Sequence, residues 1–204
     1  MHGRLGDDRL PRGVPTGEPE PPGGVAPWLE ERLFKQRIVL VQGRLSVEQA
    51  SRAAAILLSF EGDEPIELHM STPDGDLAGM FALADALAMT TAPVRAVARA
   101  EVGGAAVGVF ASTGRRMAFP HARFRLAEPK AGQLAGTADQ VVKAAGEYLR
   151  GVEQLVLCVA EACGKPRSRV EDDFQAGRML NAQEALEYGL VDEILNPPRG
   201  GGRA

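Results

Sequence analysis

Short extended segments alternate with helical segments along most of this chain, and this alternation limits the fold more than any other feature of the sequence. Apolar runs and period-two patterns predict strands. These strands are expected at 37–41, 65–70, 94–100, 116–119, 123–126 and 190–195. Apolar residues spaced three and four apart predict helices between them. The repeated order of strand, helix and strand, with short connections, predicts an α/β protein with parallel or mixed strand pairing.

Helix-starting signals support this order. Three residues of the N-cap type are each followed, three positions later, by Gln or Glu, which is the pattern of a capping box. They are Ser46, Thr137 and Asn181. The helices that start at Ser46 and Asn181 are expected to end near residues 61 and 189, and the helix that starts at Thr137 is expected to be long. Two further helices are predicted, one at 77–90 after the turn Thr72-Pro73-Asp74-Gly75 and one that follows Gly103-Gly104 and ends near 112.

The helix that starts at Thr137 carries a single apolar stripe, because its apolar residues step by three and four while most charged residues lie elsewhere. The stripe consists of Val142, Ala145, Leu149, Val152, Val156 and Val159. We expect this stripe to be buried, either against the core of the same chain or against another subunit.

The length of 204 residues fits one domain. Residues 1–27 contain six Pro and six Gly and few core-forming side chains, so we expect a flexible N-terminal tail there. Residues 196–204, with Pro-Pro and three consecutive Gly, are expected to be a disordered C-terminal tail. The folded domain is therefore expected to span 28–195.

Composition excludes several classes of function. The net charge of −4 disfavours binding to nucleic acid. The longest uncharged stretch, Val102–Gly114, is shorter than the roughly 18–20 residues that span a bilayer, and the N-terminus lacks the pattern of a signal peptide. We therefore expect a soluble cytoplasmic protein without a membrane partner. The two cysteines, Cys158 and Cys163, form neither a disulfide framework nor a zinc pattern, and no metal or cofactor is expected.

Five segments, in order, resemble one family. The resembling region opens with LEERLFKQRIV at residues 29–39, has TPDG where the family has SPGG, and has GRRMAFPHARFRLAEP where the family has GKRYALPNARVMIHQP. The helix start GTADQ and the ending LNAQEALEYGLVDEIL also match. From residue 28 to residue 195 the chain thus resembles ClpP, the proteolytic subunit of the Clp ATP-dependent protease.

The resemblance implies a spiral of strand-strand-helix units of the ClpP/crotonase type, from which the long helix protrudes as a handle. It also implies seven-subunit rings, either homomeric or shared with other ClpP-like subunits, that stack around a chamber. In the family an unfoldase ATPase docks on the ring. The docking positions correspond to Glu67, His69 and Met89 here, where charged and polar residues stand at two of the three.

The same resemblance locates the catalytic triad positions. The nucleophile of the family corresponds to Gly103, or to Val102 or Gly104 if the gap is shifted, and none of these bears a hydroxyl. The base corresponds to Ala127, whereas the acid is retained as Asp173. Loss of a triad nucleophile or base costs on the order of 10⁶ in rate. The oxyanion loop corresponds to Asp74, Gly75 and Gly104, with an added carboxylate at the first position.

The sequence offers few replacements, since histidine occurs at three positions and serine at six. Ser112 and His121 are the best spare pair, and both are expected to be surface polar residues. We therefore expect a non-catalytic ClpP-like subunit that acts structurally or in assembly. Two alternatives remain open at this point. One is an active ATP-dependent serine endopeptidase, and the other is a crotonase-like enzyme acting on acyl thioesters with Glu101, Asp74 or Glu128 as acid or base.

Overall fold

The computed structural model describes residues 26–130 and 136–196. The terminal segments 1–25 and 197–204, for which tails were expected, lie outside the described residues. The elements in chain order are α1 (Pro27–Lys35), β1 (Ile38–Gln42), α2 (Val47–Ser59), β2 (Ile66–Thr72), α3 (Leu77–Met89), β3 (Val94–Gly103), α4 (Ala106–Ala111), β4 (Arg115–Ala118), β5 (Arg123–Leu126), α5 (Ala138–Cys163), α6 (Arg167–Gln175), β6 (Arg178–Asn181), α7 (Ala182–Tyr188) and β7 (Glu193–Ile194).

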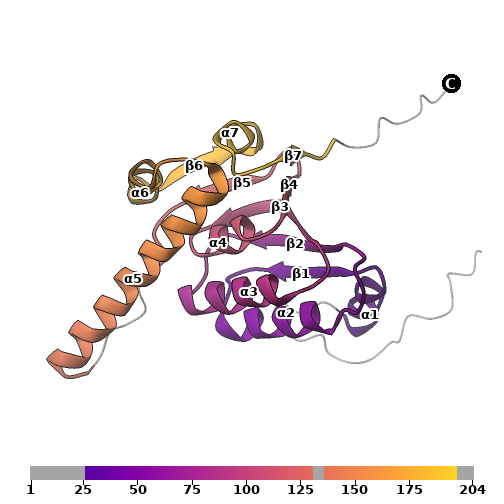
Figure 1. Cartoon of the computed structure of the whole chain (residues 1–204), viewed down its shortest axis with the longest axis horizontal. Helices are drawn as coiled ribbons and strands as arrows, with labels where there is room; N and C mark the ends of the chain where they lie inside the picture. Colours follow the sequence, from indigo (N-terminus) through magenta and orange to yellow (C-terminus); the bar gives the residue numbers. More distant parts are fainter. Residues whose placement is uncertain (1–25, 131–135, 197–204) are drawn as a thin grey trace, which may run out of the picture.

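The strands form one mixed sheet that forks at β3 (Figure 1). Strands β1, β2, β3, β4 and β7 are parallel neighbours in that order. The first half of β3 pairs with β4, whereas its last three residues pair with β5. Strand β6 then pairs antiparallel with β5. The expected α/β class with mixed pairing is confirmed.

One face of the sheet lies under helices α2, α3 and α4. Strand β2 alternates strictly between buried and half-buried residues, as a strand with a single covered face does. Its buried residues Ile66, Leu68 and Met70 join one core cluster with residues of the three helices. Glu67 and His69 lie on the opposite face and are half-buried. Within the two described ranges, no helix has the length and the apolar composition needed to cross a bilayer.

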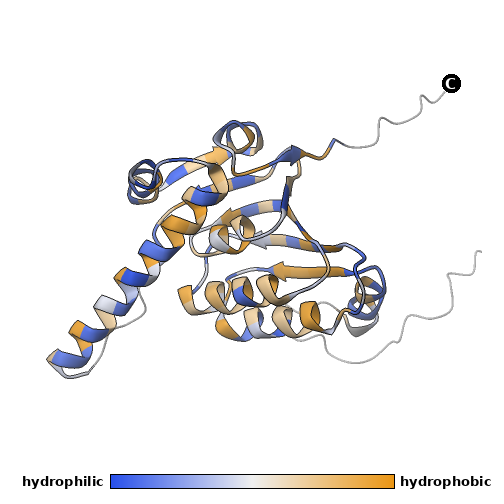
Figure 2. Ribbon diagram, in the orientation of Figure 1, coloured by the Kyte–Doolittle hydropathy of each residue, from blue (hydrophilic) through white to orange (hydrophobic). Residues whose placement is uncertain are grey.

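Helix α5 has two halves with different surroundings. Its C-terminal half packs on the body, where Leu155, Val156 and Val159 are buried. Its N-terminal half protrudes from the body (Figure 1), and the side chains of Val142 and Leu149 there are 72% and 65% exposed. Figure 2 shows that orange, hydrophobic segments alternate with blue ones along this helix. The predicted stripe is therefore buried by this chain along only part of its length.

The capping predictions are confirmed at two helices and in part at the third. Reciprocal capping boxes start α5 at Thr137 and α7 at Asn181. At α2 the Ser46 hydroxyl accepts the hydrogen bond of the Gln49 N–H, but the Gln49 side chain donates to the carbonyl of Gln42 instead of returning to the cap. The start of α2 thus depends on Ser46 alone.

Three elements were not predicted, namely α1, α6 and β6. Helix α6 is mostly polar, with Val170, Asp173 and Phe174 as its buried residues, so its sequence lacks a strong apolar period. The last strand, in turn, is shorter than the predicted range 190–195. Leu190 and Val191 are buried but hydrogen-bond to the carbonyl of Ala185 rather than to a neighbouring strand.

Candidate functional site

The fork in the sheet brings together the positions that the resemblance assigns to a catalytic triad. Gly103 is in register with Arg125, and the N–H of Gly104 donates to the carbonyl of Arg125 at 3.1 Å. Leu126, the residue before Ala127, is in register with Arg178 on β6. The Arg178 guanidinium in turn binds Asp173 on α6 at 3.1 Å. Three segments far apart in the sequence therefore meet around β5.

The turn from β3 to α4 consists of two buried glycines. Gly104 has φ of +55°, the left-handed region that favours glycine. A β-carbon on Gly103 would lie well inside 3.0 Å of the Pro73 carbonyl oxygen, closer than real β-carbons come to other atoms. Val102, the third candidate position, is fully buried in the core. None of the three positions presents a nucleophilic side chain, and Gly103 has no room for one.

The Asp74 carboxylate occupies the space beside this turn. Its Oδ1 atom accepts a hydrogen bond from the N–H of Gly75 at 2.8 Å. The same oxygen lies 2.5 Å from the point that a β-carbon on Gly104 would take. The N–H at Gly75, which the resemblance places in the oxyanion loop, therefore already has an anionic partner from its own chain.

Arg44 holds the other side of the Asp74 carboxylate. Its Nη1 donates to Asp74 Oδ2 at 2.7 Å, and its Nη2 donates to Asp76 Oδ1, also at 2.7 Å. The hydrogen bond to Asp76 is the main reason why the pKa of Arg44 lies above its ordinary value. A parallel bridge between Leu45 and Gly75 delivers Arg44 to this position, since Leu45 exchanges backbone hydrogen bonds with Asp74 and Asp76.

A second arginine holds the same turn from β5. The Arg125 Nη2 donates to the carbonyl oxygen of Pro73 at 2.5 Å, and its Nε lies 3.3 Å from Glu101 Oε1. Glu101 and Asp74, two of the side chains considered as an acid or base, are thus both engaged with arginines. The turn between β2 and α3 is consequently held against the glycine pair from two directions.

Asp173 is the centre of a largely buried polar cluster, with its side chain 8% exposed. It accepts hydrogen bonds from Arg178 and, at 2.9 Å, from the hydroxyl of Tyr188, and it forms an ion pair with Arg169 at 3.3 Å. Burial and the hydrogen bond to Asp173 raise the pKa of Tyr188. The carboxylate oxygens already have three partners, which is what a structural carboxylate requires.

Tyr148 on α5 lies within the electrostatic reach of this region. Its hydroxyl donates to the carbonyl of Pro129. Burial, followed by the charges of Glu128 and Asp74, raises the pKa of Tyr148 above its ordinary value. The hydroxyl of Tyr148 thus connects α5 to the segment that follows β5.

The spare pair Ser112 and His121 shares no hydrogen bond in the part of the chain that the structure describes. The Ser112 hydroxyl donates to the carbonyl of Gly108 at 2.8 Å and lies 3.4 Å from the sulfur of Cys158. His121 is exposed in the turn between β4 and β5. Ser112 therefore acts as a helix-end residue whose hydroxyl has a backbone acceptor.

The positions linked to ATPase docking lie apart from the glycine turn. On β2, His69 Nε2 lies 2.8 Å from Glu67 Oε2 on the half-buried face of the sheet. Met89, at the end of α3, is 74% exposed. The first two residues thus satisfy each other's polar groups, while the methionine presents an apolar side chain to solvent.

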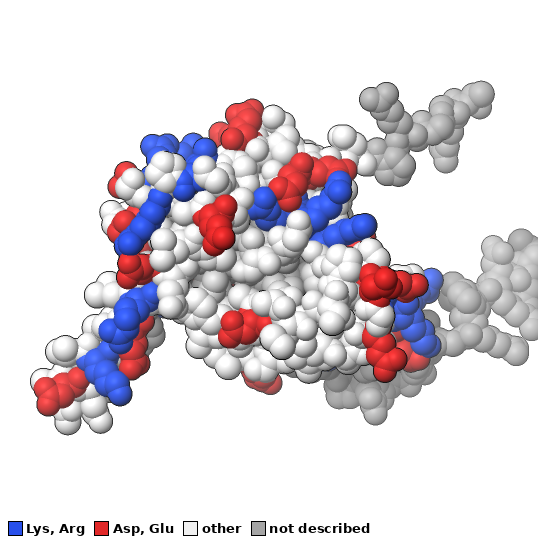
Figure 3. Space-filling model, in the orientation of Figure 1, with Lys and Arg blue, Asp and Glu red and all other residues white. Residues whose placement is uncertain are grey.

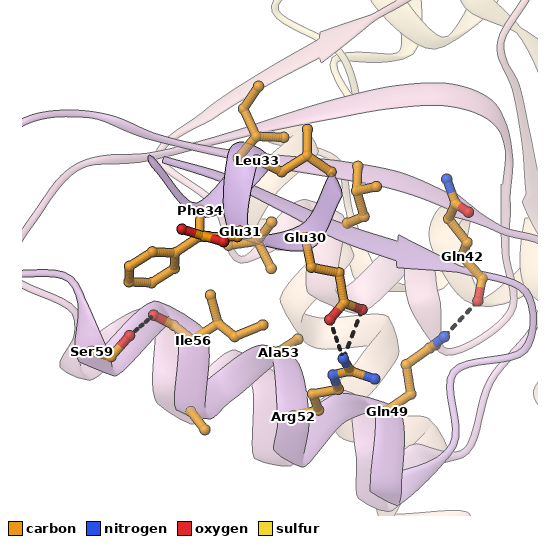
Figure 4. Close-up of a pocket in the computed structure, with 14 residues that line it drawn as sticks. Glu30, Glu31, Leu33, Phe34, Gln42, Gln49, Arg52, Ala53, Ile56 and Ser59 are labelled. Atoms are coloured by element: carbon orange, nitrogen blue, oxygen red, sulfur yellow. Dashed lines mark hydrogen bonds and ion pairs between the residues drawn. The ribbon is translucent and has the colours of Figure 1, made fainter. Parts of the chain in front are cut away.

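A cavity of about 600 Å³ lies away from the glycine turn in the fold. It lies between α1, β1 and α2, and the ion pair between Glu30 and Arg52 spans it (Figure 4). Phe34 from α1 and Ile56 from α2 are among its apolar lining residues (Figure 4). The cavity contains none of the positions that the resemblance assigns to catalysis.

Among the described residues, no group of three His, Cys, Asp or Glu side chains is arranged to hold a metal ion. On the face seen in Figure 3, acidic and basic side chains are interspersed rather than gathered by sign.

Sequence reasoning identified the glycine turn, Asp74 and Asp173, but it missed four residues that determine their surroundings. They are Arg44, Arg125, Arg178 and Tyr188. No spacing rule links Arg44 to a carboxylate 30 positions later. The one available signal was Asp74, because a partly buried carboxylate requires a hydrogen-bond donor such as an arginine.

Comparison with known proteins agrees with this architecture. A family model described as Clp protease matches residues 26–198. The chain is also similar to the ATP-dependent Clp protease proteolytic subunit 2 of Streptomyces coelicolor. The two are 28% identical over 169 residues, which cover 80% of this chain and 78% of that protein.

Proposed function

Because the chain belongs to the Clp protease family, we propose that it is a non-catalytic ClpP-like subunit, which contributes structure or regulation to a proteolytic ring in the cytoplasm. The family consists of serine peptidases whose members form oligomeric rings. What separates this chain from its active relatives is the chemistry at the fork of the sheet.

The observation that carries the proposal is the packing of Gly103 and Gly104. A serine peptidase needs a hydroxyl that can reach a carbonyl carbon, with a base within hydrogen-bond distance of that hydroxyl. At Gly103 the Pro73 carbonyl fills the space of a side chain, and at Gly104 the Asp74 carboxylate does so. A peptide carbonyl placed here would meet an anion at the point where negative charge must develop, which opposes the transition state.

The other two triad positions support the same conclusion. Ala127 has no group that could accept a proton. Asp173 would have to orient a histidine, yet its oxygens are bound by Tyr188 and two arginines. In this reading Asp173 has a structural role, because its ion pair with Arg178 joins α6 to β6, the strand that pairs with β5.

Crotonase-like chemistry and ordinary proteolysis are less well supported. Of the three candidate acids and bases, Glu101 is paired with Arg125 and Asp74 with Arg44, while Glu128 is exposed just beyond β5. Ordinary proteolysis would need a hydroxyl and an imidazole in contact. Ser112, the best placed spare serine, already donates its hydroxyl to Gly108.

The protruding half of α5 supports assembly into rings. The apolar side chains of Val142 and Leu149 are exposed to water, which is unfavourable. Contact with another subunit would bury them. We propose seven-subunit rings in which this chain combines with copies of itself or with ClpP-like subunits that retain the triad. The pairing of Glu67 with His69 on the proposed docking face favours a weaker or altered contact with a Clp ATPase on this subunit.

Native mass spectrometry combined with a peptidase assay tests this proposal. The purified chain is expected to form rings, alone or with an active ClpP-like subunit from the same cell, and to hydrolyse no fluorogenic peptide by itself. A Val142→Asp/Leu149→Asp variant should lose the stacked assembly, whereas Lys143→Ala, on the same exposed half of the helix, should retain it. Peptide turnover by the chain alone, at a rate comparable to an active subunit, would overturn the proposal.

A further inference from the structure

We propose that the space between Gly75 and Gly104 is a carboxylate-binding site, whose ligand in this protein is the side chain of Asp74. When Asp74 does not fill it, the site is expected to take a small external carboxylate, such as acetate or the C-terminus of a peptide. This inference rests on the contacts of the turn and not on the absence of peptidase activity.

The site supplies one donor to each carboxylate oxygen. The N–H of Gly75 faces Oδ1 at 2.8 Å, and the Arg44 guanidinium faces Oδ2 at 2.7 Å. A hydrogen bond to a charged group is stronger than one between neutral groups, and arginine matches carboxylates better than lysine does. With its side chain 19% exposed, Asp74 is withdrawn from most solvent competition.

Gly104 makes the space that the carboxylate fills. A β-carbon there would come within 2.5 Å of Asp74 Oδ1, so any side chain at this position would compete with the ligand. The left-handed backbone of Gly104 disfavours such a side chain independently. The glycine turn and the carboxylate therefore fit each other as a pair.

The two donors stay in place without Asp74. Arg44 retains its second contact, at 2.7 Å to Asp76 Oδ1. Gly75 stays fixed because Leu45 hydrogen-bonds to the backbone on both sides of it. A β-carbon on Gly75 would lie 2.7 Å from the β-carbon of Leu45, which shows how closely these two segments are held together. The site is thus preorganised by groups other than its ligand.

Because Asp74 is part of the chain next to the site, the intact protein is not expected to bind external carboxylates. Asp74 directly precedes Gly75, so its effective concentration at the site exceeds that of any free anion at millimolar levels. Wild-type protein should therefore show no saturable response to acetate. Binding of an external carboxylate should be measurable only after the Asp74 carboxylate has been removed.

The experiment compares wild type with Asp74→Ala by titrating sodium acetate at constant ionic strength and following the amide of Gly75 by ¹H–¹⁵N NMR. In the variant we expect a saturable shift of this amide with a Kd on the order of 1–100 mM, and no such shift in wild type. Adding Arg44→Gln to the variant should weaken acetate binding at least tenfold. The matched control Asp76→Ala, which leaves Asp74 in place, should remain as insensitive as wild type.

Equal responses of the Gly75 amide in wild type and Asp74→Ala, or none in either, would overturn the proposal. If Asp74→Ala is unfolded in chloride buffer, the proposal requires acetate to restore its circular dichroism signal beyond what sodium chloride does at the same ionic strength. Failure of acetate to do so would count equally against it. Because no readout here depends on peptide hydrolysis, the outcome is separate from the proposed function.

Discussion

Asp74 Oδ1 lies 2.5 Å from the point that a β-carbon on Gly104 would occupy, so the carboxylate of one residue fills the space of the other's missing side chain. The same turn carries the Pro73 carbonyl, which blocks a side chain at Gly103. These two contacts close the turn between β3 and α4 to any residue larger than glycine. They connect the glycine pair of this turn to the packing of the loop before α3.

A Gly103→Ala substitution is expected to destabilise the fold by about 1–3 kcal/mol, because the added methyl group must displace the Pro73 backbone rather than a flexible side chain. Urea denaturation followed by circular dichroism measures this change. The matched control is Gly114→Ala, whose β-carbon would meet its nearest neighbour at 3.9 Å. That control should stay within about 0.5 kcal/mol of wild type or be slightly stabilising. Equal stabilities for the two variants would mean that the turn is not closed as described.

Asp173→Ala is expected to destabilise the protein by about 2–3 kcal/mol, since it leaves the buried hydroxyl of Tyr188 without its acceptor and removes the charged acceptor of Arg178. Tyr188→Phe removes only one hydrogen bond to the same carboxylate and should cost about 1–2 kcal/mol. Thermal and urea unfolding of both variants give the comparison. Asp172→Ala, an exposed neighbour on the same helix, serves as the control and should be nearly neutral. A neutral Asp173→Ala would show that this carboxylate was not retained for packing.

Cys163 gives a prediction about pH. Burial raises the pKa of its thiol to about 11, so the folded state holds this proton more tightly than the unfolded chain, whose thiol titrates near 8.5. The resulting contribution to stability is fully present below pH 8.5 and is lost as the pH rises toward 11. In a Cys158→Ala background, the rate of alkylation by iodoacetamide should keep rising with pH up to about 11. A plateau near pH 8.5 in the folded protein would contradict the burial of this thiol.

Local signals accounted for most of the fold. The caps at Thr137 and Asn181 and the alternating strand at 66–72 depend on residues close in sequence, so they could be predicted without knowledge of tertiary contacts. Helix α6 could not, because Val170 and Phe174 are its only buried apolar residues and its third buried residue, Asp173, depends on partners outside the helix.

The surroundings of the candidate site were harder to predict than its positions. The glycine pair and Asp74 stand out from a short stretch of sequence. Arg44 reaches Asp74 only because the bridge between Leu45 and Gly75 brings two distant loops together. Arg125 reaches Pro73 only because β3 changes partners from β4 to β5. Both contacts follow from the sheet topology, which single-sequence patterns do not specify.

The most direct test of the central claim is covalent labelling of the purified chain with a serine-reactive fluorophosphonate, read out by intact-mass and peptide mass spectrometry. An active ClpP-type serine peptidase, labelled in parallel, confirms that the reagent works. We predict that none of the six serines of this chain becomes modified under conditions that label the active enzyme to completion. Stoichiometric modification of any one serine, accompanied by peptide turnover, would contradict the account.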